Sequence, residues 1–178
     1  MSVFSNRSID PPQERAKYAQ AILELVGGRE PLSILRETPS AAARAIEGLT
    51  RAQIRTPEAA GKWSIAHVLQ HLADSDLVWG WRMRLILAQD RPAITGYDQD
   101  LWADRLHYAD TDPALALDQL RVLRRGNLAL LEHATPEDLT RVGVHSERGE
   151  ESAGYMIGLY AGHDLLHLRQ IERIRGRV

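Results

Sequence analysis

Two histidines, His163 and His167, lie four residues apart near the end of the sequence, in a segment with the apolar pattern of a helix. Positions four apart on an α-helix differ by about 40° in direction and about 6 Å in height, so both imidazoles can reach one metal ion. The face that they share also carries Met156, Leu159, Tyr160, Gln170, Ile171 and Ile174. Two buried imidazoles without strong partners would each cost about 1–3 kcal/mol, and a shared cation removes that cost. The pair therefore predicts a metal site, with two packed core histidines as the alternative.

A third ligand is expected from an earlier pair of histidines, His67 and His71. The apolar stripe of their segment consists of Ile65, Val68, Leu72, Trp79, Met83 and Ile86. Projected at about 100° per residue, His71 lies at the edge of this stripe and His67 about 40° further toward solvent. We therefore predict His71, His163 and His167 as the metal ligands. His67 could be a fourth metal ligand, an acid or base beside the metal, or a surface residue, and we prefer the last two of these roles.

Two further residues are candidates for the chemistry itself. Asp74 follows His71 by about one helical turn and could orient an imidazole or act as a general base. Gln170 follows His167 by one turn on the inward face, where its amide needs a partner and could bind a ligand or a metal-bound water. The alternatives are a solvated surface carboxylate for Asp74 and a packing role for Gln170.

Three neutral imidazoles leave at least one coordination position free, which is typical of a catalytic site and not of a closed structural one. The ligand set suits Zn²⁺, Ni²⁺ or Fe²⁺ and does not choose among them. Such an ion can lower the pKa of a bound water to about 7 or hold an incoming thiol as its thiolate. The sequence has no cysteine, so the protein itself supplies neither a thiolate ligand nor a thiol nucleophile.

The elements that would position these residues are helices. Helical periodicity, Ser, Thr or Asp caps and Pro or Gly breaks predict a peripheral helix over 13–26, bundle helices over 38–48, 64–89, 112–133 and 152–175, and a long crossover from about 90 to 109. The predicted fold is all-α, an antiparallel four-helix bundle with an extra N-terminal helix. We divide the chain into a lead with the peripheral helix over 1–37 and the bundle over 38–178, in one domain overall. No alternating pattern is long enough to demand a sheet.

Composition excludes several function classes. The 178 residues carry a formal net charge of -2, and the basic residues form no continuous arm that could follow a phosphate backbone, so we expect no nucleic-acid partner. No segment approaches the roughly 18 apolar residues of a membrane span, and no signal-peptide pattern begins the sequence. We therefore expect a cytoplasmic protein without a membrane partner.

Three stretches carry a family resemblance. Lys62-Trp63-Ser64-Ile65 leading to His71-Leu72-Ala73-Asp74-Ser75, together with Gly162 to Ile171, resembles the DinB-like superfamily. Pro92-Ala93-Ile94 through Tyr97-Asp98 and Trp102-Ala103 is similar to its YfiT branch of metal-dependent hydrolases and bacillithiol transferases. The resemblance spans about residues 38–174. It implies a four-helix bundle, frequent homodimers and one divalent ion, often nickel or zinc, on the histidines that here are His71, His163 and His167.

The resemblance also implies a reaction, namely transfer of a low-molecular-weight thiol such as bacillithiol or mycothiol to an electrophile. Our leading hypothesis is therefore a metal-dependent thiol S-transferase, with the thiol and an electrophilic substrate as its partners. The alternatives are a hydrolase that uses metal-bound water, and a metal-binding dimerisation module without turnover. A further histidine that often lies next to or shortly after the position of His71 in that branch is replaced here by Gln70 and Asp76.

Overall fold

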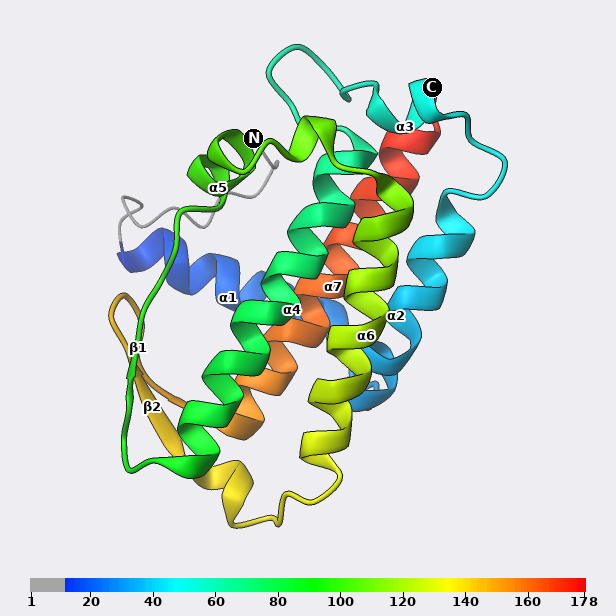
Figure 1. Cartoon of the computed structure of the whole chain (residues 1–178). Helices are drawn as coiled ribbons and strands as arrows, with labels where there is room; N and C mark the ends of the chain where they lie inside the picture. The colour runs from blue at the N-terminus through cyan, green and yellow to red at the C-terminus, as the bar shows by residue number, and fades with distance from the viewer. Residues whose placement is uncertain (1–11) are drawn as a thin grey trace.

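The computed structural model describes residues 12–178 (Figure 1), so residues 1–11 of the predicted lead lie outside the described residues. Long helices dominate this part of the chain, as predicted, and a small sheet lies at one end. The elements are α1 (Pro12–Val26), α2 (Pro31–Ala45), α3 (Arg51–Arg55), α4 (Ile65–Ala88), β1 (Ala93–Ile94), α5 (Gln99–Arg105), α6 (Pro113–Leu131), β2 (Val142–His145), β3 (Gly149–Ser152) and α7 (Ala153–Arg175). Short 3-10 turns cover Tyr108–Asp110 and Asp138–Thr140.

Helices α2, α4, α6 and α7 form the bundle. Within the bundle, α7 and α6 each pack against both α2 and α4. Figure 1 shows α2 and α7 running upward and α4 and α6 running downward, so these two pairs are antiparallel to each other. Because α4 and α6 run in the same direction, the chain between them must cross the length of the bundle. That connection is the predicted long crossover, and it contains β1 and α5.

Three of the four bundle helices begin where their caps predicted. The Ser64 side chain accepts from the backbone N–H of His67 to start α4, Asp112 caps α6 before Pro113, and Ser152 caps α7. Each cap satisfies an N–H group that has no partner inside the helix. These starts fix the rotation of α4 and α7 and thereby the direction of the histidines that they carry.

The predicted start of the first bundle helix at Thr38 is wrong. Helix α2 begins at Pro31, with Glu30 as the cap, and runs through Thr38 and Pro39 to Ala45. Within this helix the Thr38 hydroxyl donates back to the Ile34 carbonyl at 2.9 Å, so it does not cap a new one. A proline inside a helix leaves the carbonyl four residues earlier without its usual N–H partner. Here that carbonyl belongs to Leu35, and it accepts from Arg124 Nη1 at 2.6 Å.

The small sheet was not predicted from the sequence. Strand β1 pairs parallel to β2, and β2 pairs antiparallel to β3. Gly143 on β2 lies against Ile94 and Ile86 so closely that an added Cβ would be 2.7 and 2.9 Å from their side chains. This contact ties the beginning of the crossover to the end of α4. Strands of two to four residues carry too little alternation to be recognised in a sequence.

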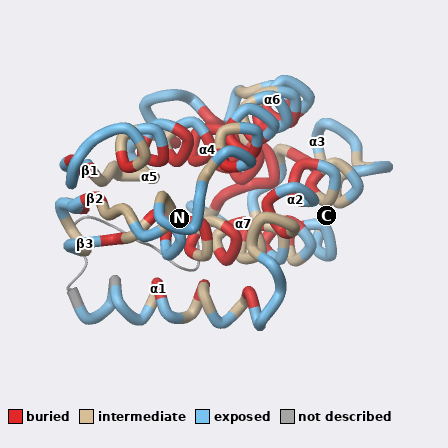
Figure 2. Tube along the Cα trace, turned by 90° about the horizontal axis from the view of Figure 1, so that it is seen from below, coloured by how far each residue is buried: buried red, intermediate tan, exposed pale blue. Residues whose placement is uncertain are grey.

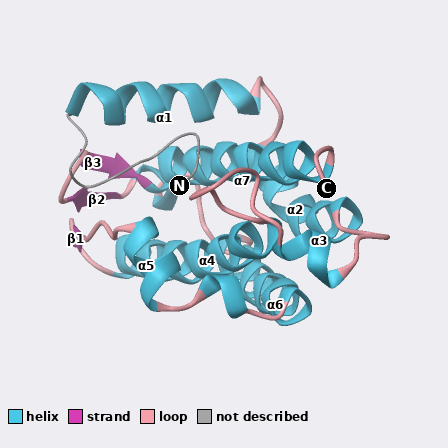
Figure 3. Ribbon diagram, turned by 90° about the horizontal axis from the view of Figure 1, so that it is seen from above, coloured by secondary structure: helices cyan, strands magenta, loops and turns pink. Residues whose placement is uncertain are grey.

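Helix α1 lies outside the bundle, along α7, in both Figure 2 and Figure 3. Its buried residues include Ala19 and Ile22, which pack with Leu159 of α7. The two helices approach most closely at Gly162, where an added Cβ would lie 2.0 Å from the Ile22 carbonyl oxygen. Among the described helices, none combines the length and the apolar character needed to cross a bilayer.

Candidate metal centre

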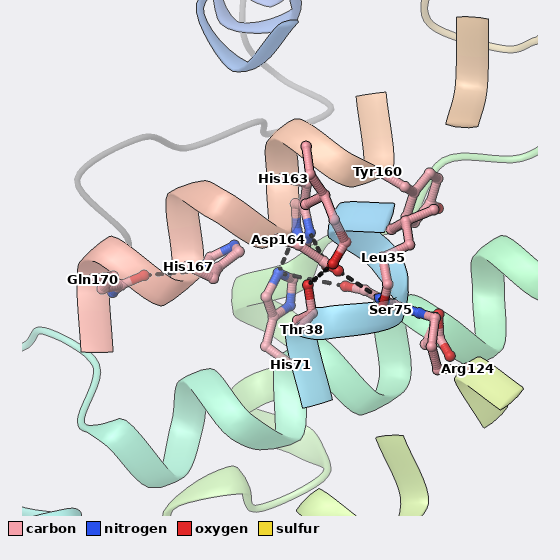
Figure 4. Close-up of polar contacts among 12 residues, drawn as sticks. Leu35, Thr38, His71, Ser75, Arg124, Tyr160, His163, Asp164, His167 and Gln170 are labelled. Atoms are coloured by element: carbon pink, nitrogen blue, oxygen red, sulfur yellow. Dashed lines mark hydrogen bonds and ion pairs between the residues drawn. The ribbon is translucent and has the colours of Figure 1, made fainter. Parts of the chain in front are cut away.

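The structure brings His71 of α4 together with His163 and His167 of α7 (Figure 4). His71 and His167 are buried, and His163 is partly exposed. The Nε2 atoms of His71 and His163 are 3.1 Å apart, and one ring nitrogen from each of the three residues lies within 4.8 Å of the others. Two ligand nitrogens at about 2.0–2.1 Å from a tetrahedral zinc ion are about 3.4 Å apart. The spacing therefore suits three ligands of one ion.

Two imidazoles of this cluster, those of His71 and His167, are poor bases, because burial favours their neutral form. Burial and the neighbouring His167 and His163 hold the pKa of His71 well below 6.5. Burial and His163 lower the pKa of His167 to about 3. Neutral rings with free lone pairs are the form that binds metal. The buried Nδ1 atom of His71 has no hydrogen-bond partner in the described chain, and its ring packs against Trp63 with the ring centroids 5.0 Å apart. Nδ1 of His163 lies 3.9 Å from the carboxylate of Asp164.

Gln170 has a partner in this cluster. Its Oε1 atom accepts a hydrogen bond from Nδ1 of His167 at 2.9 Å. When Nδ1 of an imidazole donates in this way, the proton is held there and Nε2 keeps its lone pair for a metal. Gln170 thus contacts a ligand ring, as its inward position suggested. The two side chains come from the same face of α7.

A buried ion-pair network centred on Arg124 lies next to the three histidines. Arg124 of α6 donates to Asp76 of α4 at 2.8 Å and to Asp164 of α7 at 2.7 Å, in addition to the Leu35 carbonyl of α2 (Figure 4). Burial alone would raise the pKa of Asp164, but Arg124 and His163 hold it below its ordinary value. One guanidinium thereby joins all four bundle helices next to His163. Arg124 was not predicted from its sequence context, although it is a charged residue on the apolar stripe of a helix, between Leu120 and Leu128, and this pattern could have indicated it.

The other two catalytic candidates lie away from the metal ligands. The Asp74 carboxylate accepts from the Tyr108 hydroxyl at 2.6 Å and from Gln70 at 3.1 Å, on the side of α4 that faces the crossover. His67 completes the capping box of α4, with its Nδ1 atom 2.8 Å from the Ser64 hydroxyl. The structure therefore gives Asp74 and His67 partners in the fold and does not bring them to the three histidines.

A pocket opens onto the histidine cluster. Its volume is about 90 Å³, compared with the roughly 10–15 Å³ that one water molecule needs. It is lined by Tyr18, Ala19, Ile22, His71, Ser75, Arg82, Tyr97, Gln99, Arg148, Leu159, Tyr160 and His163. The Ser75 hydroxyl lies 2.9 Å from the Tyr97 hydroxyl and 3.5 Å from His71 Nε2. Helix α1, α4, the crossover, the turn between β2 and β3 and α7 all contribute to the wall, so the pocket gives a small molecule access to His71 and His163.

Several pocket residues were missed in the sequence. Arg82 and Ser75 lie on α4 among apolar neighbours, and Arg148 lies in a turn, so nothing in their spacing connects them with the histidines. Tyr97 is recognisable in the sequence through the family resemblance of the crossover, and the structure places the centroid of its ring 4.4 Å from that of Trp102. These residues meet only because the crossover folds back over α4.

A comparison of the sequence with protein families identifies the chain. The model of the DinB superfamily matches residues 34–171. The chain belongs to the DinB superfamily. The predicted resemblance is thereby confirmed, and the match includes all three histidines of the cluster.

Curated relatives within the DinB superfamily cover most of this chain. The protein named "Putative metal-dependent hydrolase YfiT" from Bacillus subtilis (strain 168) is 31% identical over 151 residues, which are 83% of each chain. The Oceanobacillus iheyensis protein OB0782, with the same kind of name, is 30% identical over 137 residues, or 77% of this chain and 79% of its own. The solved structure of YfiT from Bacillus subtilis matches with a TM-score of 0.76 at 27% identity and covers 98% of this chain and 93% of its own. That structure is described as a probable metal-dependent hydrolase with an unusual four-helix bundle topology.

Proposed function

We propose that this protein is a divalent-metal-dependent enzyme in which His71, His163 and His167 hold one ion. The observation that carries the proposal is the approach of their ring nitrogens to within 4.8 Å of one another at the end of a pocket. The names of the relatives, which describe metal-dependent hydrolases, support it. Zinc and nickel are the preferred ions and iron is a third candidate, since all three accept imidazole ligands.

The proposed reaction is the transfer of a low-molecular-weight thiol to an electrophile. A bound divalent ion lowers the pKa of a thiol or a water and so supplies a nucleophile at neutral pH. The thiol must come from outside, because the chain has no cysteine. In the transfer a carbon–sulfur bond forms, the bond to the leaving group of the electrophile breaks, and the thiol proton passes to solvent.

The lining of the pocket favours a thiol over water as the nucleophile. Among the described residues no Asp or Glu lines it, so no carboxylate is placed there to take a proton from water or to protonate a leaving group. A thiol, with an ordinary pKa of about 8.5, needs less help than water to ionise beside a cation. The residues of the chain would hold the reactants in place, with Ser75 and Tyr97 beside His71.

Hydrolysis is the second candidate, and the names of the relatives favour it. In that reaction water would attack an ester or amide that enters by the same pocket. The two candidates share the metal site and differ in the nucleophile.

A thiol-consumption assay tests the leading proposal. The zinc- or nickel-loaded protein is incubated with monochlorobimane and, separately, bacillithiol, mycothiol or glutathione. We expect consumption of at least one thiol above the uncatalysed rate, lost in His71→Ala and retained in His133→Ala, which removes an exposed histidine at the end of α6. If none of the three thiols is consumed faster than without protein, thiol transfer is wrong. Ester hydrolysis that needs no thiol and is lost in His71→Ala would select the hydrolase instead.

A further inference from the structure

The pocket beside the histidines contains a buried positive charge that the proposed chemistry does not use. Arg82 of α4 is 6% exposed and lines the pocket. No carboxylate of the described chain forms an ion pair with it. The second arginine in the lining, Arg148, is neutralised by two hydrogen bonds to Glu151. Because no Asp or Glu lines the pocket, the charge of Arg82 is uncompensated there.

The guanidinium of Arg82 is fixed but only partly satisfied. It donates to the Thr95 carbonyl at 2.6 Å and to the Tyr160 hydroxyl at 3.2 Å. A guanidinium has five N–H donors, and the buried Nε of Arg82 has no partner in the described structure. A buried donor without an acceptor costs about 1–3 kcal/mol, so a ligand that supplies one gains by binding there.

A second unsatisfied donor belongs to the same pocket. Nε2 of Gln99, at the start of α5, is buried without a hydrogen-bond partner in the described structure, and its side chain lines the pocket. The Tyr160 hydroxyl accepts from Arg82 and so keeps its own hydrogen for donation. Arg82, Gln99 and Tyr160 come from three separate elements, and each offers an N–H or O–H group.

We propose that Arg82, with Gln99 and Tyr160, forms a subsite for a carboxylate group of the substrate, next to the metal centre. The inference rests on the proposed function in placing the reacting end of that substrate at the histidines. A carboxylate matches the planar guanidinium and balances one positive charge. A phosphate group fits less well, because a single uncompensated arginine faces the pocket and two of its donors are already taken by the protein. The substrate class is therefore a small organic acid that carries a thiol or an electrophilic carbon.

The test compares two probes that differ at one end. The ¹⁵N-labelled protein, with and without zinc, is titrated with 3-mercaptopropionate and with 3-mercapto-1-propanol, and dissociation constants are taken from amide and Arg Nε–H shifts in NMR spectra. A charge-assisted hydrogen bond predicts about tenfold or more tighter binding of the carboxylate probe. Arg82→Met should remove this preference and leave the affinity for the alcohol unchanged.

The control is Arg121→Met, which removes an exposed arginine paired with Asp118 on α6 and should keep the preference. If Arg82→Met does not fold, as judged by the dispersion of its spectrum, Gln99→Leu and Tyr160→Phe test the same subsite, and each should reduce the preference severalfold. Equal affinities for the two probes in the wild-type protein, or a preference that persists in all folded variants, would overturn the proposal.

The zinc-free titration separates the two proposals. If zinc raises the affinity for both probes equally and no carboxylate preference exists, the subsite is wrong and the metal centre stands. If zinc raises the affinity for neither probe but the carboxylate preference persists, the subsite stands and activation of a thiol by the metal is wrong.

Discussion

At the scale of single residues, the candidate site combines three histidines and Gln170 with two buried arginines, Arg82 and Arg124. A histidine pair at helical spacing on an apolar face is a strong pattern because both rings must point the same way. A buried arginine leaves a weaker pattern in the sequence, which for Arg124 is a charge on the apolar stripe of a helix, because its burial depends on carboxylates and carbonyls from other helices. Arg124 has partners on three other helices, at Asp76, Asp164 and Leu35.

Gln170 provides the first prediction. Gln170→Leu removes the acceptor that holds the Nδ1 proton of His167. Loss of such a partner lowers metal affinity about 10–100-fold, while the isosteric apolar side chain keeps the helix packed. Competition with a chelator measures the affinity, and Glu172→Ala, at an exposed position on α7, is the control. Unchanged affinity in Gln170→Leu would show that the amide does not orient the ligand.

The pKa values of the ligands predict how the stability of the metal-free protein depends on pH. His71 and His167 have pKa values far below the 6.5 expected in the unfolded chain, with His167 at about 3. Between pH 6.5 and these lower values the unfolded chain binds more protons at the two histidines than the folded chain does, so their contribution to the free energy of unfolding falls as the pH drops below 6.5 and is level above it.

Urea denaturation of the metal-free protein measures this dependence. The pH values, about 7.5, 6.5, 5.5 and 4.5, lie on both sides of the ordinary pKa of histidine. In a double variant, His71→Gln with His167→Gln, the free energy of unfolding should lose most of its dependence on pH between about 6.5 and 5.5. A free energy of unfolding that stays constant or rises on acidification in the wild-type protein would contradict the prediction.

At the scale of elements, helices with a clear cap were predicted to within a residue or two, and those whose start depends on tertiary contacts were not. Ser64, Asp112 and Ser152 act locally, as their sequence context suggests. Thr38-Pro39 has the same local pattern but lies inside α2, because Arg124 satisfies the carbonyl that Pro39 leaves free. The short strands likewise form only because β1 and β2 meet across a long stretch of sequence.

The contact between α1 and α7 provides a prediction at this scale. Gly162→Ala would place a Cβ 2.0 Å from the Ile22 carbonyl oxygen, so α1 must shift from the pocket that Tyr18, Ala19 and Ile22 help to line. Such overpacking costs about 1–3 kcal/mol. The matched control is Gly126→Ala on α6, where an added Cβ meets nothing within 4 Å and the change should stabilise the helix by about 0.5–1 kcal/mol. Urea denaturation of both variants checks the opposite signs, and a neutral Gly162→Ala would mean that α1 is not held in this position.

At the scale of the whole molecule, the bundle explains how residues 92 positions apart in sequence meet. Helices α4 and α7 are neighbours, and the crossover and α1 close the space around their histidines. The general architecture followed from the sequence because amphipathic helices with breaks between them have few ways to pack. The pocket could not be predicted in the same way, because its walls come from five separate segments whose contacts no local pattern encodes. A homodimer stays a prediction at this scale.

The metal content of the protein, purified without a polyhistidine tag and measured by elemental mass spectrometry, tests the central claim most directly. We predict close to one zinc or nickel ion per chain in the wild-type protein and in His133→Ala, and a small fraction of that in a folded His163→Ala variant. Wild-type protein that holds no stoichiometric divalent ion, even after incubation with these metals, would contradict the account, as would a His163→Ala variant that keeps its full complement.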